Sequence, residues 1–201
     1  MNRLEALDHF HKTYGEAVLN QKLHQVASLY EHRKEELIFS FIQSFQLICL
    51  QANSAEMAKI RIGYITYSMR RTYLMERNYN YVIEVYGKGW YFDPQPWHGT
   101  YDAGWAFSLL AELEDELNQL RKPYMNKVIQ PDVERYVLQV AWEFHQYILK
   151  LAKDAILQAV QLPEFQALKC ENDLEIRIGE YKGISEVVYP TAYGVLHDST
   201  G

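Results

Sequence analysis

The sequence has few residues that could form disulfides or metal centres. Only Cys49 and Cys170 are cysteines among 201 residues, and neither has a second Cys or a His at the spacing of a metal ligand. Because reducing compartments keep thiols free, two isolated cysteines are typical of a cytoplasmic protein. We therefore expect two reduced thiols, a cytoplasmic location and no metal site.

Phosphate-binding loops are also missing. The sequence has no Gly-rich loop leading into a helix start, and Gly87-Lys88-Gly89 precedes Trp90 with no helical pattern behind it. Such a segment is typical of a hairpin turn and not of a nucleotide site. We expect no cofactor.

Long apolar runs are absent as well. The most apolar stretch, residues 37–50, is interrupted by four polar residues and is shorter than a membrane span. Residues 1–16 mix charged with apolar side chains and lack the continuous apolar segment of a secretory signal. Together these two absences predict that the protein does not associate with a membrane.

The residue type that the sequence has in excess is tyrosine. Sixteen tyrosines occur in a chain that is 48% hydrophobic and 23% charged, a composition close to the globular average. A tyrosine buries its ring while its hydroxyl stays available to water or a partner, so the excess favours exposed strands and interfaces. No linker rich in Gly, Ser or Pro divides the chain. We expect one domain over residues 1–201, with a flexible tail at 190–201.

Helical periodicity covers much of the chain. Apolar residues recur at helical spacing over residues 4–18, 26–53 and 106–120. The clearest pattern begins at Pro131, which suits a first helical turn, and keeps one apolar stripe until Pro163. It predicts a long helix near residues 132–161, about 45 Å in length at 1.5 Å per residue.

Two regions show the period-two alternation of strands. Residues 59–74, 81–86 and 90–92 predict a three-stranded antiparallel meander with short turns, and residues 174–179 and 184–189 predict a C-terminal hairpin. Residues 93–100 contain two prolines and a glycine and predict an irregular loop or a hinge.

A short repeat connects the two strand regions. Ile60-Arg61-Ile62-Gly63 recurs as Ile176-Arg177-Ile178-Gly179, which marks either two strands with the same inside-outside pattern or two strands that pair. The whole pattern predicts an α+β fold. In it, an antiparallel sheet, made of the central meander and the C-terminal hairpin, is covered on one face by several amphipathic helices, including the long one near 132–161.

Residues 59–88 are basic although the chain is acidic. They contain six Lys or Arg and two Glu, a net charge of +4 against −6 for the chain, and six tyrosines lie among them. Arginine beside tyrosine on a sheet can hold phosphates and stack bases, or can form cross-strand pairs that stabilise the sheet. The residues predicted to bind a partner, in this region and the loop after it, are Arg61, Arg70, Arg71, Tyr73, Trp90, Trp97 and Tyr101.

Residues 90–105 are rich in aromatic rings and include three candidates for acid-base chemistry. Asp93, His98 and Asp102 could converge, since imidazole titrates near neutrality and a carboxylate can orient it. The alternatives are that the two aspartates cap turns or the next helix, that the tryptophans close the end of the core, or that the rings anchor an interface.

Three hypotheses for function follow. The leading one is a cytoplasmic binding protein that uses the Tyr/Arg-rich sheet and the aromatic loop to engage a protein partner or a second copy, in preference to a small molecule. The second is a small enzyme with an acid-base site at loop 93–102, in which His98 acts as acid or base and Arg70 or Arg71 holds an anionic substrate. The third is a binder of single-stranded nucleic acid, which the acidic balance of the chain disfavours.

Overall fold

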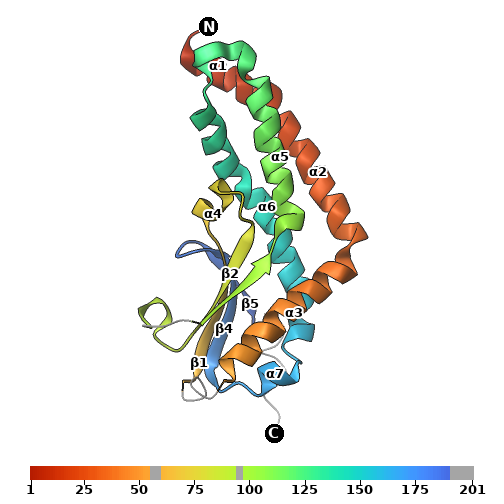
Figure 1. Ribbon diagram of the computed structural model, residues 1–201, viewed down its shortest axis with the longest axis vertical. Coiled ribbons are helices and arrows are strands. Elements are labelled where there is room, and N and C mark those ends of the chain that lie inside the picture. The colour runs from red at the N-terminus through yellow and green to blue at the C-terminus, as the bar shows by residue number, and fades with distance from the viewer. Residues whose placement is uncertain (55–59, 94–96, 191–201) are drawn as a thin grey trace. The chain divides into compact units, whose positions relative to one another are not determined.

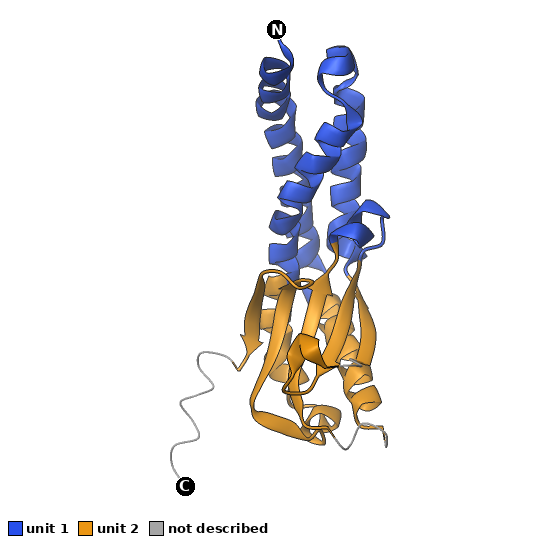
Figure 2. Ribbon diagram, turned by 90° about the vertical axis from the view of Figure 1, so that its left-hand side faces the viewer, with its two compact units in different colours: residues 1–34, 71–79, 103–148 blue, residues 35–70, 80–102, 149–201 orange. Residues whose placement is uncertain are grey.

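The computed structural model describes residues 1–54, 60–93 and 97–190 (Figure 1). The chain forms two compact units, one of residues 1–34, 71–79 and 103–148 and the other of residues 35–70, 80–102 and 149–201 (Figure 2). The first unit is helical, and the second contains the sheet. The expected tail, 190–201, lies outside the described residues except for Pro190. That the tail is flexible and that the chain is one domain both stay predictions.

The helical unit is built from amphipathic segments. Its elements are α1 (Arg3–Phe10), the π-helical turn η1 (His11–Gly15), α2 (Glu16–His32), α4 (Arg71–Met75), α5 (Gly104–Leu120), the 3-10 turn η3 (Lys122–Lys127) and the first part of α6 (Gln130–Ala159). Helix α1 begins with a capping box, in which the side chains of Asn2 and Glu5 each accept a hydrogen bond from the other residue's backbone N–H. The predicted long helix is confirmed by α6, and the helix predicted at 106–120 is confirmed by α5.

The break predicted between helices 4–18 and 26–53 is wrong in position. Residues 3–32 are helical throughout, and the backbone departs from helical geometry at Arg33 (φ −113°, ψ 17°), before α3 (Lys34–Ala52). The polar gap at 19–25 contains neither glycine nor proline, and its Leu, Gln and Lys residues are good helix formers. A polar stretch of this kind changes which side of a helix is exposed to solvent, but it does not end the helix.

Helices α2 and α5 lie side by side in the helical unit (Figure 1). Val26 on α2 and Leu113 on α5 are fully buried. Lys22, also on α2, is only 7% exposed, and its Nζ lies 2.9 Å from Oε2 of Glu112 on α5. The pair therefore joins the two helices through a cation that is almost entirely removed from water.

The second unit holds five strands in the order β3-β2-β1-β4-β5. They are β1 (Ile62–Met69), β2 (Asn80–Tyr86), β3 (Trp97–Asp102), β4 (Cys170–Glu180) and β5 (Ser185–Tyr189), and the short helix α7 (Pro163–Gln166) precedes β4. The predicted C-terminal hairpin is confirmed by the antiparallel pair of β4 and β5.

The prediction of a purely antiparallel sheet is wrong at one pair. Strands β1 and β4 are parallel, while the other neighbouring strands are antiparallel. The chain enters β4 beside the start of β1, where the N–H of Ile62 donates to the carbonyl of Lys169 at 2.8 Å. The two strands therefore run in the same direction, after a long connection that includes helices, as parallel pairing requires.

The short repeat occurs on these two paired strands, although not in register. Ile65 pairs with Ile176 and Tyr67 with Ile178, so the second copy of the repeat lies beside residues further along β1. Of the two interpretations that the repeat allowed, pairing of the strands is the one that the structure shows.

The predicted meander is wrong in two segments. Residues 72–74 belong to helix α4, and residues 90–92 form a 3-10 turn, η2 (Trp90–Phe92). The third strand is β3, which begins inside the segment 93–100 expected to be irregular and continues to Asp102. Gly99 in this strand faces α3 so closely that an added Cβ would lie 3.3 Å from Cδ1 of Ile48. A glycine inside an edge strand marks such a close approach and weakens the sequence pattern of the strand.

The two faces of the sheet differ in chemistry. On one face, Tyr67 stacks on Phe41 of α3 with ring centroids 4.8 Å apart, and its hydroxyl lies 3.2 Å from Oγ of Ser44. In Figure 1 the yellow-green turn after β2 projects from the opposite side of the strands. On that opposite face, Thr66 and Ser68 are each only 3% exposed although they are polar. A buried polar face is the unusual feature of this sheet, and it forms the candidate site.

Candidate functional site

One row of polar side chains crosses the sheet on the face opposite α3. The register pairs His98 of β3 with Glu84 of β2, Glu84 with Thr66 of β1, and Thr66 with Arg177 of β4. Directly opposed residues on neighbouring strands point to the same face of a sheet. These four residues, called the polar ladder below, are therefore neighbours although they come from four separate parts of the chain.

The centre of the polar ladder is the buried carboxylate of Glu84. The side chain is only 2% exposed, and its Oε1 lies 3.5 Å from Nη2 of Arg70 and 3.7 Å from Nδ1 of His98. Its Oε2 is buried and accepts no hydrogen bond from the residues that the structure describes. A buried polar atom without a partner costs free energy, so an added hydrogen-bond donor at Oε2 would be stabilising.

Tyr86 lies next to Glu84 on the same side of β2. Burial raises the pKa of its hydroxyl, and the negative charge of Glu84 and a hydrogen bond to that carboxylate raise the pKa further. The hydroxyl therefore stays protonated and donates to Glu84. The carboxylate thus has one fixed neutral donor, beside an arginine and a histidine.

Aromatic rings cover the neighbouring row of the sheet. Trp90 stacks on Tyr64 at 4.2 Å and on Tyr91 at 5.1 Å, and Tyr91 meets Tyr181 edge to face at 6.3 Å. Trp90 takes a left-handed backbone conformation (φ 50°), which places its ring over β1 at the start of η2. We call Trp90, Tyr91 and Tyr181 the aromatic cover.

Two guanidinium groups lie against this cover. Arg70 stands 4.1 Å from the ring centroid of Tyr181, and Arg177 stands 5.2 Å from that of Trp90. Such cation-π contacts stabilise by about 0.5–2 kcal/mol each, depending on exposure. Arg177 also contacts the carboxylate of Glu175 and donates to Oγ of Ser185 at 3.0 Å. Both arginines are held in place before any ligand binds.

The aromatic cover contains a second buried polar atom without a partner. Nε1 of Trp90 donates no hydrogen bond to any residue in the described part of the chain. Phe92, two residues further on, is 95% exposed. The site therefore offers a buried acceptor and a buried donor, and an exposed ring follows in the same 3-10 turn.

The structure brings together three of the residues predicted from the sequence. Arg70, Trp90 and His98 lie on the polar ladder or against the aromatic cover. Asp93 lies beside the turn before η2, so close to Gly89 that a Cβ on that glycine would overlap its carboxylate. Asp102 pairs with Asn80 at the far end of β3, four residues from His98, or about 13 Å along the strand. The carboxylate next to His98 is that of Glu84.

The other predicted binding residues lie apart from the polar ladder. Arg61 donates to the carbonyl of Cys170, and Trp97 pairs with Val85, on the side that faces α3. Tyr101 is only 2% exposed and packs against Phe41. Arg71 and Tyr73 belong to α4 in the helical unit.

Sequence reasoning missed Glu84, Tyr86, Arg177 and Tyr181 as site residues. One signal for Glu84 was available: it is the only charged residue in Tyr81–Tyr86, a strand otherwise made of apolar and aromatic residues. A carboxylate at such a position is almost never buried unless it has partners, so it predicts a polar cluster.

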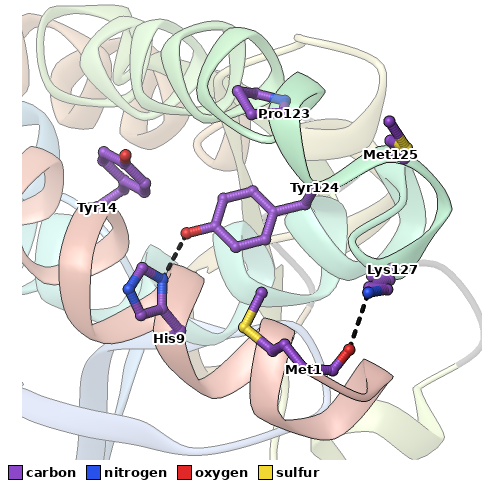
Figure 3. A pocket seen from close by; sticks show the side chains of 7 residues that line it. All are labelled: Met1, His9, Tyr14, Pro123, Tyr124, Met125 and Lys127. Atoms are coloured by element: carbon purple, nitrogen blue, oxygen red, sulfur yellow. Dashed lines mark hydrogen bonds between the residues drawn. The ribbon is translucent and has the colours of Figure 1, made fainter.

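The helical unit has a separate cavity of about 310 Å³ (Figure 3). The hydroxyl of Tyr124 lies 2.6 Å from Nδ1 of His9, and Nζ of Lys127 donates to the carbonyl of Met1 at 2.8 Å. Burial raises the pKa of Tyr124, and the neighbouring Tyr14 raises it further. The residues that line the cavity are Met1, His9, Tyr14, Pro123, Tyr124, Met125 and Lys127. Its polar groups already face one another, and none of them was predicted from the sequence.

The cysteines offer no reactive thiol. Burial raises the pKa of Cys49 to about 12. Burial also raises the pKa of Cys170, which lines a hollow of about 280 Å³ with Phe165 and Tyr189, although Arg61 acts in the opposite direction. Because the thiolate is the nucleophile, neither side chain is activated for covalent chemistry.

Within residues 1–54, 60–93 and 97–190, no helix is long and apolar enough to cross a membrane. No group of three or more His, Cys, Asp or Glu side chains is arranged to hold a metal ion in the same residues.

Comparison of the chain with known protein families, with curated proteins and with solved structures gave no match.

Proposed function

We propose that this chain is a binding protein that docks a protein partner on the polar ladder and the aromatic cover. The observation that carries the proposal is the buried Oε2 of Glu84, which accepts no hydrogen bond from the described residues. A group that completes this site must bring a hydrogen-bond donor to the sheet.

A peptide segment matches the two unpaired atoms. Glu84 presents an acceptor and Trp90 a donor, and one peptide group carries both an N–H and a C=O. Trp90 stacks on Tyr64, whose row is two residues away from the row of Glu84. Two residues of a strand span about 7 Å, so the two rows lie within the length of a short extended segment.

The surrounding side chains support a protein partner. Tryptophan, tyrosine and arginine are the residues that contribute most to binding at protein interfaces. The aromatic cover and the guanidinium groups of Arg70 and Arg177 supply all three types, and their mutual stacking fixes them in advance. Rigid contact groups lose less entropy on binding.

Affinity capture with matched variants tests this proposal. Glu84→Gln removes the charge but keeps the shape, Trp90→Phe removes the N–H but keeps an aromatic ring, and the exposed Glu76→Gln is the control. Losing one hydrogen bond to a charged group costs about 1.5–3 kcal/mol, which is a loss of affinity of about tenfold or more. We expect the wild type and Glu76→Gln to retain one protein near equal stoichiometry from a lysate of the host. The Glu84 and Trp90 variants should retain it at least about tenfold more weakly.

Either of two results would count against the docking proposal. One is a partner that all four baits retain equally, which would place the interface elsewhere. The other is a folded wild-type bait that retains no protein at near-stoichiometric level.

The Glu84–His98 pair favours an enzyme as the second candidate function. A buried carboxylate 3.7 Å from Nδ1 of an exposed imidazole can orient that ring for proton transfer, and Arg70 lies beside the same oxygen to hold an anionic substrate. Adding inorganic phosphate should then shift the NMR resonances of the His98 ring in the wild type and not in Arg70→Met. Unchanged resonances in the wild type would remove this candidate.

The third hypothesis, binding of single-stranded nucleic acid, has less support from the geometry. The guanidinium groups of Arg70 and Arg177 already face the carboxylates of Glu84 and Glu175. The face is therefore less positive than the count of basic residues in the sequence indicates. Affinity for single-stranded RNA that falls steeply with added salt would favour this hypothesis over the others.

A further inference from the structure

The outer side of α3 carries no charge over four turns. Residues 37–52 contain no Asp, Glu, Lys, Arg or His. Three large apolar side chains on this side are open to solvent, with exposed fractions of 61% for Phe39, 60% for Leu47 and 51% for Leu50. Together with the exposed Gln43 between them, we call these residues the α3 stripe.

An exposed helix side of this composition is unusual within this chain. The inner side of α3 is largely apolar, because Phe41, Phe45 and Ile48 form part of the core beside the buried Ser44. The outer side of such a helix normally carries charged residues. Helix α5, of similar length, follows that rule and places Glu112 and Asp115 at exposed positions. Depletion of charge with exposed aromatic and aliphatic side chains is typical of the centre of an interface.

We infer that the α3 stripe binds the same stripe of a second copy of this chain, antiparallel, across a two-fold axis at Gln43. Phe39 and Leu47 lie four residues before and after Gln43, so these two apolar positions exchange across the axis. Leu50, seven residues after Gln43, lies opposite Glu36 of the second copy at the edge of the interface. A two-fold interface requires such a self-complementary surface, because every contact occurs twice. Phe39 then packs against Leu47 of the second copy, and side chains four apart form the ridges by which helices pack.

The residue on the axis fits this arrangement. Gln43 of one copy contacts Gln43 of the second copy, and a charged residue at this position would place two like charges against each other. An amide carries both donors and an acceptor, so two glutamines can hydrogen-bond to one another across the axis. Glu35 and Glu36 lie at the start of α3, beyond Phe39, where they form the polar edge of the interface.

The size of the stripe predicts a weak dimer. Its twelve residues extend over about 18 Å of helix. One helix side of this length covers a smaller area than the roughly 800 Å² per partner that a standard interface buries. We therefore expect association that depends on concentration, with a Kd on the order of micromolar or weaker. This interface is independent of the polar ladder, which lies on the opposite face of the sheet.

Sedimentation velocity of the full chain over a wide range of concentration tests the inference. Leu47→Glu and Phe39→Lys should each raise the Kd of the dimer at least about tenfold, because each places a charge against an apolar side chain. The double variant Phe39→Lys/Leu47→Glu should restore the dimer, because the introduced charges are opposite in sign and meet across the axis. Leu157→Glu on α6, which is 59% exposed in the wild type, is the matched control and should leave the Kd unchanged.

A covalent test reports on the axis itself. In a Cys170→Ser background, which removes the partly exposed thiol, Gln43→Cys should form a disulfide-linked dimer under mild oxidation at a rate well above that of the same background without Gln43→Cys, because Cys49 is buried. A wild type that stays monomeric at all concentrations would overturn the inference. So would a double variant that is folded by circular dichroism but as monomeric as the two single variants. The latter result would mean that the α3 stripe does not bind a second copy of this chain.

Discussion

Oε1 of Glu84 lies 3.5 Å from Nη2 of Arg70, and the carboxylate is buried while the guanidinium is partly exposed. Arg70 directly follows β1, at the point where the chain leaves the sheet unit for α4. The guanidinium also lies against Tyr181, which follows β4. The Arg70 side chain thus connects the ends of β1 and β4 to the centre of β2. The polar ladder therefore stabilises the sheet in addition to forming a candidate binding site.

Arg70→Met should destabilise the protein by about 3 kcal/mol. Removing one partner of a buried ion pair leaves an uncompensated charge, which costs about 3–5 kcal/mol, and the partial exposure of Arg70 puts the effect near the lower end. Chemical unfolding of the full chain measures the loss. Arg61→Met is the matched control, because the Arg61–Glu171 pair is more exposed and should change stability by about 1 kcal/mol or less. Equal losses in the two variants would show that Glu84 does not depend on Arg70.

Most of the helices and part of the sheet were predictable from local periodicity. Helices α5 and α6 and the hairpin of β4 and β5 each carry their own pattern of buried residues within a short segment. The parallel pairing of β1 with β4 was not predictable in this way, because local alternation says nothing about which distant strand lies alongside. Strand β3 was not predicted for another reason: it is an edge strand with a glycine at a position that faces α3.

The candidate site was predictable only in part. Arg70, Trp90 and His98 could be chosen by residue type, since guanidinium, indole and imidazole groups are common in binding sites. The role of Glu84 depends on the register that places it between His98 and Thr66, and a shift of one residue would move it to the other face. Register between strands is a tertiary property, so residue type alone could not assign the carboxylate to the site.

The buried Lys22 should respond asymmetrically to mutation of its partners. Lys22→Met keeps the apolar stem and leaves only carboxylates that are largely exposed, so we expect a change in stability within about 1 kcal/mol. Glu112→Gln combined with Glu116→Gln leaves a buried ammonium without its counter-charges and should cost about 2–4 kcal/mol. Thermal and chemical unfolding of both variants provide the comparison. A larger loss for Lys22→Met would mean that the pair itself, and not the unpaired cation, determines stability.

Gly179→Ala should destabilise the sheet by at least about 2 kcal/mol. A Cβ at Gly179 would overlap the carbonyl of Ile184 and Cα of Ser185, which are backbone atoms of the hairpin and cannot turn aside. Gly183→Ala in the same hairpin is the control, because there the nearest atom is Cβ of Glu180, at 3.2 Å, on a side chain at the hairpin turn. Similar stabilities of the two alanine variants in urea would show that the hairpin does not pack as tightly as the structure has it.

Cys49 should make stability fall as the pH rises above 9. Burial raises its pKa from 9.0 to about 12, so between these values the folded state keeps a proton that the unfolded state has lost. When the folded state binds more protons, the free energy of unfolding decreases with pH, and one such group contributes about 1 kcal/mol of loss between pH 9 and pH 10. Cys49→Ala removes this group and leaves every tyrosine in place, so its unfolding free energy should fall less steeply over the same interval. Chemical unfolding at pH 8, 9 and 10 gives both slopes. Parallel curves for the wild type and the variant would mean that the thiol is not buried in its protonated form.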